Sequence, residues 1–492
     1  MKDRVPVSCG DVVQLNIGAL NHNGEGVGRH GGFAVFVPGA LPGEVVRARV
    51  TTLRANYAQA ALEWIGVASP HRVIPICDLA ADCGGCQLLH LSYDEQLRYK
   101  RRVVEDALQR IGGFGVPVAP VAGMAEPLRY RNKVQVPLGT RNGSVVAGFY
   151  ERRSHNIVPL ECCYLQPPVC DRVILAACRI VEDLGIPIYN EQTHTGFVRH
   201  LLTRYSFSAG NVLLAIITNG RTFQGGDAHS KDWGDNFTSA LRRVAPELSG
   251  IVQIINTQKG NIVLGPEEVL LWGVPHLHER LGGLEFKISP RSFFQVNTQQ
   301  TEVLYEKAVE YAALTGAETV FDLYCGSGGV SLYMARGAGR VIGVESAEPA
   351  VRDARENAAM NGISNAEFHV GRVETVVPGL YKQGTKADVV VVDPPRKGCD
   401  ITLLKILAEM QPKKIIYISC NPATLARDLR ILSQGGDVRQ NGDNNSNYGR
   451  GAHRNDARSS MRHTCYFPIA IQPVDMFPQT THVEVVALLE AR

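Results

Sequence analysis

The chain has 492 residues, a length that corresponds to two to four domains of about 150 residues each. Hydrophobic residues make up 45% and charged residues 20%, which excludes a fully disordered, collagen-like or coiled-coil chain. The sequence contains no apolar run long enough to cross a bilayer and no apolar segment near its start. We therefore expect no membrane span and a cytoplasmic location. The net charge of +3 is too small to indicate a polyanionic partner by itself.

The first part of the chain has the pattern of a small β-barrel. Residues 10–66 alternate short apolar stretches with glycine-rich turns, which predicts about five strands, and closing them into a barrel leaves no free sheet edge. We assign residues 1–67 to this domain. Residues 68–290 predict a mixed α+β domain, with a helix over 93–111 that has apolar residues at helical spacing.

The last part, residues 291–492, alternates apolar strands with helices. TVFDLYC, RVIGVE, ADVVVVDPP and KIIYISC are the predicted strands, and this alternation indicates βαβ units with a parallel sheet. The predicted fold class is therefore α/β and Rossmann-like, with two smaller domains before it. Residues 437–463 are rich in Asn, Gly, Arg and Ser, so we expect a disordered surface insertion.

A glycine-rich segment, Phe321–Gly329, joins the first of these strands to a helix. Glycines there allow the backbone to approach a ligand closely, although a plain strand-to-helix turn is an alternative. Glu345 ends the next strand, where a carboxylate accepts both hydroxyls of a ribose. Neither a third glycine at dinucleotide spacing nor a P-loop lysine is present. A nucleoside without a pyrophosphate fits better than NAD or ATP, and S-adenosylmethionine is the main candidate.

Three further residues stand where strands of the same sheet begin or end. Asp393 begins a rigid Asp-Pro-Pro-Arg loop, for which a simple turn is the alternative. Cys420 follows the fourth strand and precedes a helix, whose dipole is expected to lower the pKa of the thiol. A buried structural cysteine is the alternative there. Glu484 enters a C-terminal strand as a candidate general base, against a solvated edge-strand glutamate.

Together, a thiolate, a methyl donor and a base suggest methylation of uracil at C5. Attack of a cysteine on C6 makes C5 enolate-like, so that C5 takes the methyl group, a base removes the C5 proton, and the thiolate leaves.

A tight group of cysteines lies in the predicted central domain. Cys77, Cys83 and Cys86 form C-x5-C-G-G-C, a spacing that suits a metal centre, and the Cys162–Cys163 pair offers the fourth ligand. A four-cysteine zinc site is chemically reasonable as well.

Basic residues concentrate between positions 96 and 155, where eleven Lys and Arg stand against four Asp and Glu. The predicted phosphate-facing residues are the RYKRR run at 98–102, Arg129, Arg131, Lys133, Arg152 and Arg153, with Tyr130 and Tyr150 suited to base stacking. A solvated basic helix face is the alternative for 98–102. Chemistry at C5 also requires a flipped base or a single-stranded loop.

The motifs FDLYCGSGGVSL, VVVDPPRKG, ISCNPATLARDL and PVDMFPQTTHVE resemble those of the bacterial 23S ribosomal RNA (uracil-C5)-methyltransferases that carry an iron–sulfur cluster. The resemblance covers nearly the whole chain and implies a class I methyltransferase domain and an N-terminal TRAM domain that binds RNA.

The resemblance also implies roles for individual residues. Cys420 is the expected nucleophile and Glu484 the expected base. Gln295, Tyr324, Glu345 and Asp393 are the expected S-adenosylmethionine ligands. A 4Fe–4S cluster is expected on Cys77, Cys83, Cys86 and Cys163, the last chosen over Cys162 because Leu165 follows it by two residues, as in the family. The segment 437–463 is an insertion relative to the family.

The resulting prediction is methylation of a uridine in 23S ribosomal RNA by a monomer that has no DNA or membrane partner. The first alternative is a methyltransferase of the tRNA T-loop, and the second is a non-catalytic iron–sulfur protein that binds RNA. A methyltransferase of exocyclic amines fits less well, because Arg396 stands where an aromatic residue is needed.

Overall fold

The computed structural model describes all residues except 1–4, 153, 222, 224–232 and 437–463. It forms two compact units, each built from separate stretches of the chain. Unit 1 consists of Met1–Lys100, Gly123–Thr301 and Asp475–His482, and unit 2 of Arg101–Ala122, Glu302–Val474 and Val483–Arg492. The predicted insertion at 437–463 lies outside the described residues. No described helix is both long and apolar enough to cross a membrane.

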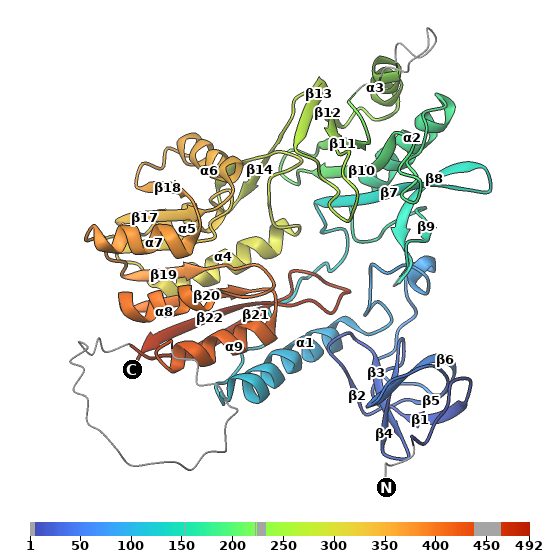
Figure 1. The fold of residues 1–492 in the computed structure, drawn as a ribbon, viewed down its shortest axis with the longest axis horizontal. Helices are drawn as coiled ribbons and strands as arrows, with labels where there is room; N and C mark the ends of the chain where they lie inside the picture. Colours follow the sequence, from blue (N-terminus) through green and yellow to red (C-terminus); the bar gives the residue numbers. More distant parts are fainter. Residues whose placement is uncertain (1–4, 153, 222, 224–232, 437–463) are drawn as a thin grey trace, which may run out of the picture. The chain divides into compact units, whose positions relative to one another are not determined.

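Unit 1 begins with a six-stranded sheet in the order β1-β5-β6-β4-β3-β2, drawn in blue in Figure 1. Its strands are β1 (Val12–Asn16), β2 (Ala19–Leu20), β3 (Gly26–His30), β4 (Phe33–Val37), β5 (Val45–Leu53) and β6 (Tyr57–Val67). Alternation decides the burial in β5, where Val46, Ala48 and Val50 form the core and the arginines between them face outward. The expected strand-rich domain is present, with six strands rather than about five.

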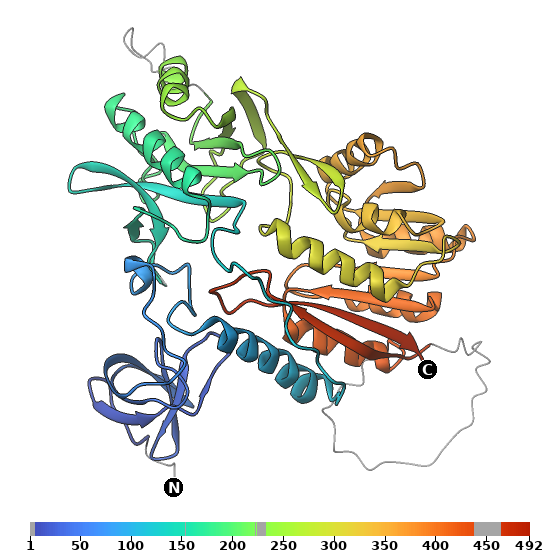
Figure 2. The same cartoon turned by 180° about the vertical axis from the view of Figure 1, so that it is seen from behind.

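A second sheet in unit 1 has the order β13-β12-β11-β10-β7-β8-β9. Its elements are β7 (Lys133–Arg141), β8 (Ser144–Tyr150), β9 (Ile157–Pro159), α2 (Pro168–Asp183), β10 (Val198–Tyr205), β11 (Val212–Thr218), α3 (Trp233–Val244), β12 (Leu248–Ile255) and β13 (Glu267–Gly273). Helices α2 and α3 cover one face of this sheet, as seen from behind in Figure 2, and a hairpin, β14 (Leu277–Leu281) with β15 (Leu284–Ile288), follows it.

A fully buried ion pair ties the C-terminal loop of unit 1 to helix α1 (Tyr93–Ala107). The Lys100 ammonium donates to the Asp475 carboxylate and to the Phe477 carbonyl, and the Tyr93 hydroxyl donates to the second Asp475 oxygen at 2.8 Å. Such a pair is held only when hydrogen bonds satisfy both charges, as they do here. The loop Asp475–His482, which precedes Glu484 in the chain, is therefore rigidly placed within unit 1.

Unit 2 contains a seven-stranded sheet in the order β18-β17-β16-β19-β20-β22-β21. Its strands are β16 (Thr319–Leu323), β17 (Arg340–Glu345), β18 (Ala366–Val370), β19 (Val389–Val392), β20 (Lys414–Ser419), β21 (Tyr466–Val474) and β22 (Glu484–Ala491). Strands β16 to β20 are parallel, whereas β21 and β22 form an antiparallel hairpin beside β20. The strand order reverses at β16, so a ligand crevice is expected at the carboxyl ends of β16 and its neighbours.

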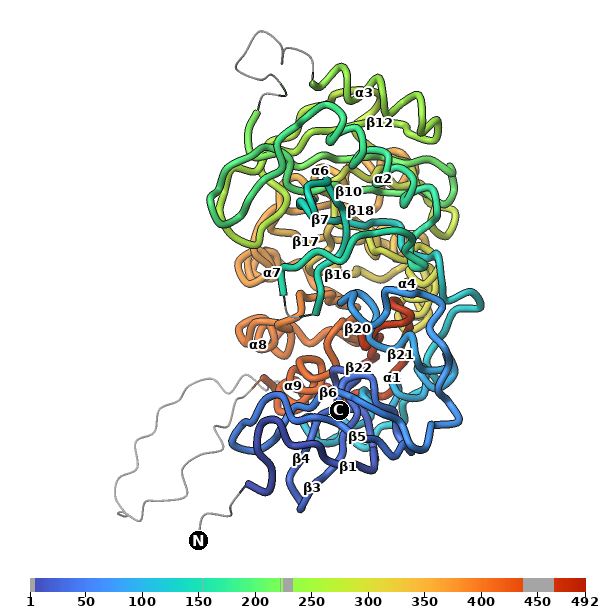
Figure 3. The backbone as a smooth tube through the Cα atoms, turned by 90° about the vertical axis from the view of Figure 1, so that its right-hand side faces the viewer, coloured from blue at the N-terminus to red at the C-terminus, as the bar shows by residue number. Residues whose placement is uncertain are grey.

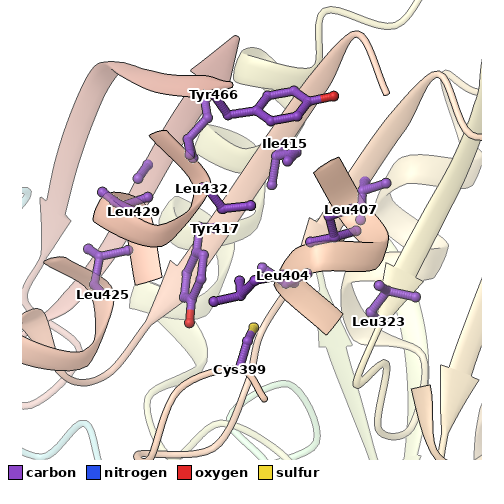
Figure 4. Close-up of a cluster of buried hydrophobic side chains, with 14 of the residues drawn as sticks. Leu323, Cys399, Leu404, Leu407, Ile415, Tyr417, Leu425, Leu429, Leu432 and Tyr466 are labelled. Carbon is purple, nitrogen blue, oxygen red and sulfur yellow. The ribbon is translucent and has the colours of Figure 1, made fainter. Parts of the chain in front are cut away.

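Helices cover both faces of this sheet, as Figure 3 shows for α7, α8 and α9 on one side and α4 on the other. The helices are α4 (Thr298–Ala312), α5 (Gly329–Ala335), α6 (Glu348–Met360), α7 (Val373–Lys382), α8 (Ile401–Met410) and α9 (Pro422–Ser433). Figure 4 shows how Leu425, Leu429 and Leu432 of α9 pack with Leu404 and Leu407 of α8 over the sheet. This burial fixes the loops that lead into both helices.

The helix predicted over 93–111 differs at its end. Helix α1 ends at Ala107 and continues as a π-helical turn, Leu108–Gly112, before Gly113 adopts a left-handed conformation (φ 77°). Val104 and Leu108 join the core of unit 2. The apolar spacing in the sequence therefore correctly indicated a buried face, although not the change in helical pitch.

Candidate active site

Cys420 and Glu484 lie at the same edge of the sheet in unit 2. Ser419, the last residue of β20, pairs with Val485 of the antiparallel strand β22. The next residues outward on these two strands are Cys420 and Glu484, so the register brings them side by side. Glu484 is 4% exposed, which excludes the solvated edge-strand glutamate considered as the alternative. Cys420 is only partly buried, and its thiol is not engaged in a disulfide.

The thiol of Cys420 is not activated in the way the sequence suggested. Burial, together with the carboxyl groups of Glu484 and Asp393, raises its pKa to about 11, although Arg396 acts in the opposite direction. The predicted lowering of this pKa by the dipole of α9 is therefore wrong. The physical reason is that two carboxyl groups and partial desolvation outweigh a helix end. Without a ligand, Cys420 is a thiol.

Glu484 and Asp393 are buried carboxyl groups that interact. Burial, followed by the Asp393 charge, raises the pKa of Glu484 to about 8. Burial and the neighbouring Asp322 raise the pKa of Asp393 to about 7. Groups poised near neutrality are suited to accept and release protons. The site therefore holds two carboxyl groups that exchange protons in the physiological range.

Arg396 supplies the positive charge in this group. Its guanidinium lowers the pKa of both Cys420 and Glu484, which places it near both side chains. The sequence offered a signal for this residue, because Arg396 closes the Asp-Pro-Pro-Arg loop. In the sequence, Arg396 argued only against a methyltransferase of exocyclic amines. Its effect on the pKa values of Cys420 and Glu484 was not predicted.

The loop that carries Arg396 is clamped by helix α9. The Asn421 amide donates to the Arg396 carbonyl at 3.1 Å, and the Arg427 guanidinium donates to the Lys397 carbonyl at 2.9 Å. The buried Asp428 carboxylate accepts the Cys399 backbone N–H at 2.8 Å. These bonds hold the Arg396 backbone from the same helix that follows Cys420.

Two further features strengthen this clamp. The Tyr417 hydroxyl donates to Asp428 at 2.6 Å, and Figure 4 shows the Tyr417 ring pointing toward the Cys399 sulfur. Gly398 has a φ of 79°, and a Cβ there would lie 2.5 Å from the Asp428 carboxylate. Only glycine allows such an approach. The sequence pattern did not reveal the clamp because its members come from separate segments.

The glycine-rich segment adopts the geometry expected of a ligand-binding turn. Gly328 caps α5 with a φ of 87°, and Tyr324 has a φ of 68°, a conformation rare for side-chain-bearing residues and common at functional sites. The Glu345 carboxylate is oriented by the backbone N–H groups of Gly326 and Ala347, at 3.3 and 2.8 Å. The buried Asp322 Oδ1 has no hydrogen-bond partner among the described residues.

These residues fit S-adenosylmethionine. A carboxylate at the end of β17 suits the ribose hydroxyls, and the unpartnered Asp322 oxygen suits a donor from a ligand. Tyr324, Glu345 and Asp393 all lie at this edge of unit 2. Gln295 belongs to unit 1, where it is 8% exposed and the Asn132 amide donates to its carbonyl at 2.9 Å.

The cysteines of unit 1 form a loose group. The thiol of Cys86 is influenced by Cys163, Cys83 and Cys77, and burial together with these neighbours raises its pKa to about 12. The Cys162 sulfur lies 3.5 Å from the Arg129 guanidinium. In the part of the chain that the structure describes, no three His, Cys, Asp or Glu side chains meet as metal ligands do.

Much of the predicted RNA-facing set is structural instead. Lys100 is buried in the pair with Asp475, and the Tyr99 hydroxyl donates to the Asn21 carbonyl. Tyr130 is 3% exposed and donates to the Pro478 carbonyl, so the prediction that it stacks on bases is wrong. The ring of Tyr150 stacks on His155 at 5.1 Å between centroids.

Two of the predicted RNA-facing arginines also make contacts within the protein. Arg129 donates to the Cys163 and Gln166 carbonyls, and Arg152 donates to the Cys86 carbonyl. These arginines brace the segments around the cysteines. Arg153 lies outside the described residues.

The doubly wound sheet, its glycine-rich turn and the edge that holds Cys420 define an S-adenosylmethionine-dependent methyltransferase. Residues 252–442 match the family described as tRNA (Uracil-5-)-methyltransferase, and residues 6–62 match the TRAM domain. An uncharacterized RNA methyltransferase of Halalkalibacterium halodurans is 43% identical over 492 residues, which cover 100% of this chain and 99% of that protein. Another from Listeria innocua is 43% identical over 477 residues, which cover 97% of each.

A solved structure supports the same conclusion. The chain resembles the tRNA (uracil-54, C5)-methyltransferase of Pyrococcus abyssi in complex with S-adenosyl-L-homocysteine, with a TM-score of 0.72, 27% identity, and coverage of 97% of this chain and 100% of that one. The protein therefore belongs to the family of RNA uracil-5 methyltransferases and carries an N-terminal TRAM domain.

The clamp yields a first prediction. Asp428→Asn keeps the size of the side chain but removes the charge that holds Arg427 and the Cys399 N–H, so the Arg396 loop loosens. We expect kcat for RNA methylation to fall about tenfold or more, since small misplacements of reacting groups are costly, while KM for S-adenosylmethionine stays constant. Steady-state kinetics measure both values. Glu409→Gln, on an exposed position of the neighbouring helix α8, is the control, and equal kcat values in both variants would contradict the clamp.

Proposed function

We propose that the protein methylates C5 of a uridine in 23S ribosomal RNA, with Cys420 as nucleophile and Glu484 as the base that removes the C5 proton. The adjacency of Cys420 and Glu484 across β20 and β22, with Asp393 and Arg396 beside them, carries the proposal. Each residue has a role that the chemistry of uracil requires.

The first step is attack of Cys420 on C6. The Cys420 proton must leave first, and Asp393 and Glu484 are the neighbouring acceptors. The Arg396 cation favours the thiolate and stabilises negative charge that develops nearby. When the S–C6 bond forms, the electron pair of the C5–C6 double bond moves onto C5 and the adjacent carbonyl.

The remaining steps, methyl transfer and proton removal, take place at C5. Bound S-adenosylmethionine would supply an electrophilic methyl group, which the enolate-like C5 takes as the methyl–sulfonium bond breaks and the thioether leaves. Glu484, as carboxylate, then removes the C5 proton. The electron pair of that C–H bond re-forms the C5–C6 double bond and expels the Cys420 thiolate. The enzyme returns to its starting state when the thiolate regains a proton and Glu484 releases the C5 proton to solvent.

An iron–sulfur cluster on Cys77, Cys83, Cys86 and Cys163 forms part of the proposal. Their chemistry fits such a group, because burial raises the pKa values of Cys83, Cys86 and Cys163, and these neighbouring thiols gain most from a cation. The Asp171 carboxylate accepts the Cys163 N–H at 3.2 Å and so orients this residue. Methyl transfer needs no redox step, so the cluster has a structural or RNA-contacting role.

Two classes of RNA, 23S RNA and tRNA, compete as the substrate of the proposed reaction. The TRAM domain and the cysteine group favour 23S RNA. The tRNA alternative is favoured by the Pyrococcus abyssi neighbour, whose title describes a tRNA methyltransferase. A direct comparison of the two RNA classes decides between them.

The test uses wild type, Cys420→Ala and Glu484→Gln with labelled S-adenosylmethionine and unmodified 23S or tRNA transcripts. We expect 5-methyluridine in 23S RNA from wild type only, because each variant lacks one required step. Glu484→Gln should accumulate a covalent RNA adduct that resists denaturing gels, since elimination needs the base. Cys420→Ala should form no adduct with 5-fluorouridine RNA. Label in tRNA alone would replace the substrate, and 5-methyluridine from Cys420→Ala would refute the nucleophile.

The raised pKa of Glu484 predicts how activity depends on pH. Only the carboxylate acts as a base, and burial sets its pKa at about 8, so kcat/KM should rise about tenfold per pH unit toward pH 8 and then level off. Stability should follow the opposite course. Because the folded pKa exceeds the unfolded value, the contribution of Glu484 is full below the unfolded pKa and declines up to about pH 8. A rate independent of pH between about 6 and 8 would contradict this assignment.

The choice of Cys163 as fourth ligand predicts a difference between two adjacent substitutions. After anaerobic purification, Cys163→Ser should lose bound iron and the brown absorbance, whereas Cys162→Ser should retain both, because Cys163 interacts with Cys83 and Cys86 while the Cys162 sulfur lies 3.5 Å from the Arg129 guanidinium. Iron analysis and the visible spectrum provide the measurement. Wild type without iron would refute the cluster, and iron lost only from Cys162→Ser would exchange the two roles.

A further inference from the structure

Two cations lie on the second sheet of unit 1, on the face opposite helices α2 and α3, and a third, Arg131, stands just before strand β7. Lys133 of β7 and Arg204 of β10 are direct partners in the antiparallel register, so their side chains point to the same side. Neither belongs to the apolar core that covers the helix-bearing face, to which their neighbour Val134 contributes. Arg131 precedes Lys133 by two residues.

The charged groups that act on Lys133 are themselves cations. Within the described residues, Arg204 and Arg131 are the charges that influence it, and both disfavour its ammonium form. Burial and these two neighbours lower the pKa of Lys133 to about 7. Among the described residues, no ion pair includes any of the three. Positive charge is costly in such surroundings unless an anion compensates it.

Arg204 is held in place by neutral groups. It is 2% exposed, its guanidinium donates to the Ser292 and Pro290 carbonyls, and its Nε has no partner among the described residues. Its charge is thus fixed but not neutralised. Lys133 is partly buried, whereas Arg204 is fully buried, so Lys133 is the more exposed of the two cations. Arg131 also lies near Cys86 and lowers the pKa of that thiol. The presence of Arg131 by itself is therefore explained by the cysteine group as well as by an RNA contact.

We infer that Lys133, supported by Arg131 and Arg204, binds a backbone phosphate of the RNA substrate. RNA carries one negative charge per nucleotide with no compensating positive charge, which matches three unbalanced cations. The carboxylate of S-adenosylmethionine is the other anion to consider, because Gln295 follows Ser292 by three residues. That molecule also carries an ammonium and a sulfonium group and is a net cation, so the three cations favour phosphate.

The inference rests on RNA as the substrate of the proposed reaction, but its test does not depend on methylation. Wild type, Lys133→Gln, Lys133→Arg and the exposed control Lys259→Gln are titrated with oligouridine between about 50 and 200 mM KCl. For Lys133→Gln we expect weaker binding and a slope of log K against log salt that is less negative by about 0.7, the value for one single-stranded phosphate contact. Lys133→Arg and Lys259→Gln should keep the wild-type slope.

Two parallel measurements separate the alternatives. Calorimetry should give the same affinity for S-adenosylmethionine in all variants, and a loss restricted to this affinity in Lys133→Gln would assign the site to the cofactor carboxylate. The melting temperature of Lys133→Gln should equal or exceed that of wild type, because the substitution removes repulsion between buried cations. An unchanged salt slope, or a Lys133→Gln variant that fails to fold, would overturn the inference. Absence of 5-methyluridine with the expected slopes would refute the proposed reaction alone.

Discussion

The burial of two carboxyl groups and one thiol around a single guanidinium is the constraint on which the active site depends. Desolvation raises the pKa values of Cys420, Glu484 and Asp393, and the Arg396 cation lowers those of Cys420 and Glu484. A site of this kind holds its protons until a ligand changes the balance of charge. In its resting state the site holds Cys420 as a thiol, and in the proposed reaction Cys420 and Glu484 act as nucleophile and base.

Such a balance needs a rigid frame, because Coulomb interactions at low dielectric change steeply with distance. The sheet provides part of the frame, since the register of β20 with β22 sets Cys420 beside Glu484. Helix α9 provides the rest. It begins two residues after Cys420. Hydrogen bonds from Asn421, Arg427 and Asp428 hold the backbone of the Arg396 loop. One helix therefore positions both the nucleophile and the cation.

Unit 1 contains buried cations of two kinds, one in an ion pair and the others outside any described ion pair. Lys100 is matched by Asp475 and serves the rigidity of the loop before Glu484. Lys133 and Arg204 are in no ion pair among the described residues; burial makes both charges less favourable, and neighbouring arginines add to this for Lys133. A paired cation stabilises a structure, whereas an unpaired one is retained at some cost to stability and is typical of a binding site. The sequence presents all three simply as basic residues.

Local patterns in the sequence were sufficient to determine much of this protein. Alternation of strands and helices indicated the parallel sheet, glycines marked the turn before α5, and the motifs around Cys420 and Glu484 identified the family, because these features depend on short-range geometry and residue chemistry. The tertiary structure alone decided the raised pKa of Cys420, the burial of Lys100 and Tyr130, the clamp on Arg396 and the proximity of Cys163 to Cys83 and Cys86. These properties depend on desolvation and on charges brought together from distant parts of the chain, which no sequence spacing records.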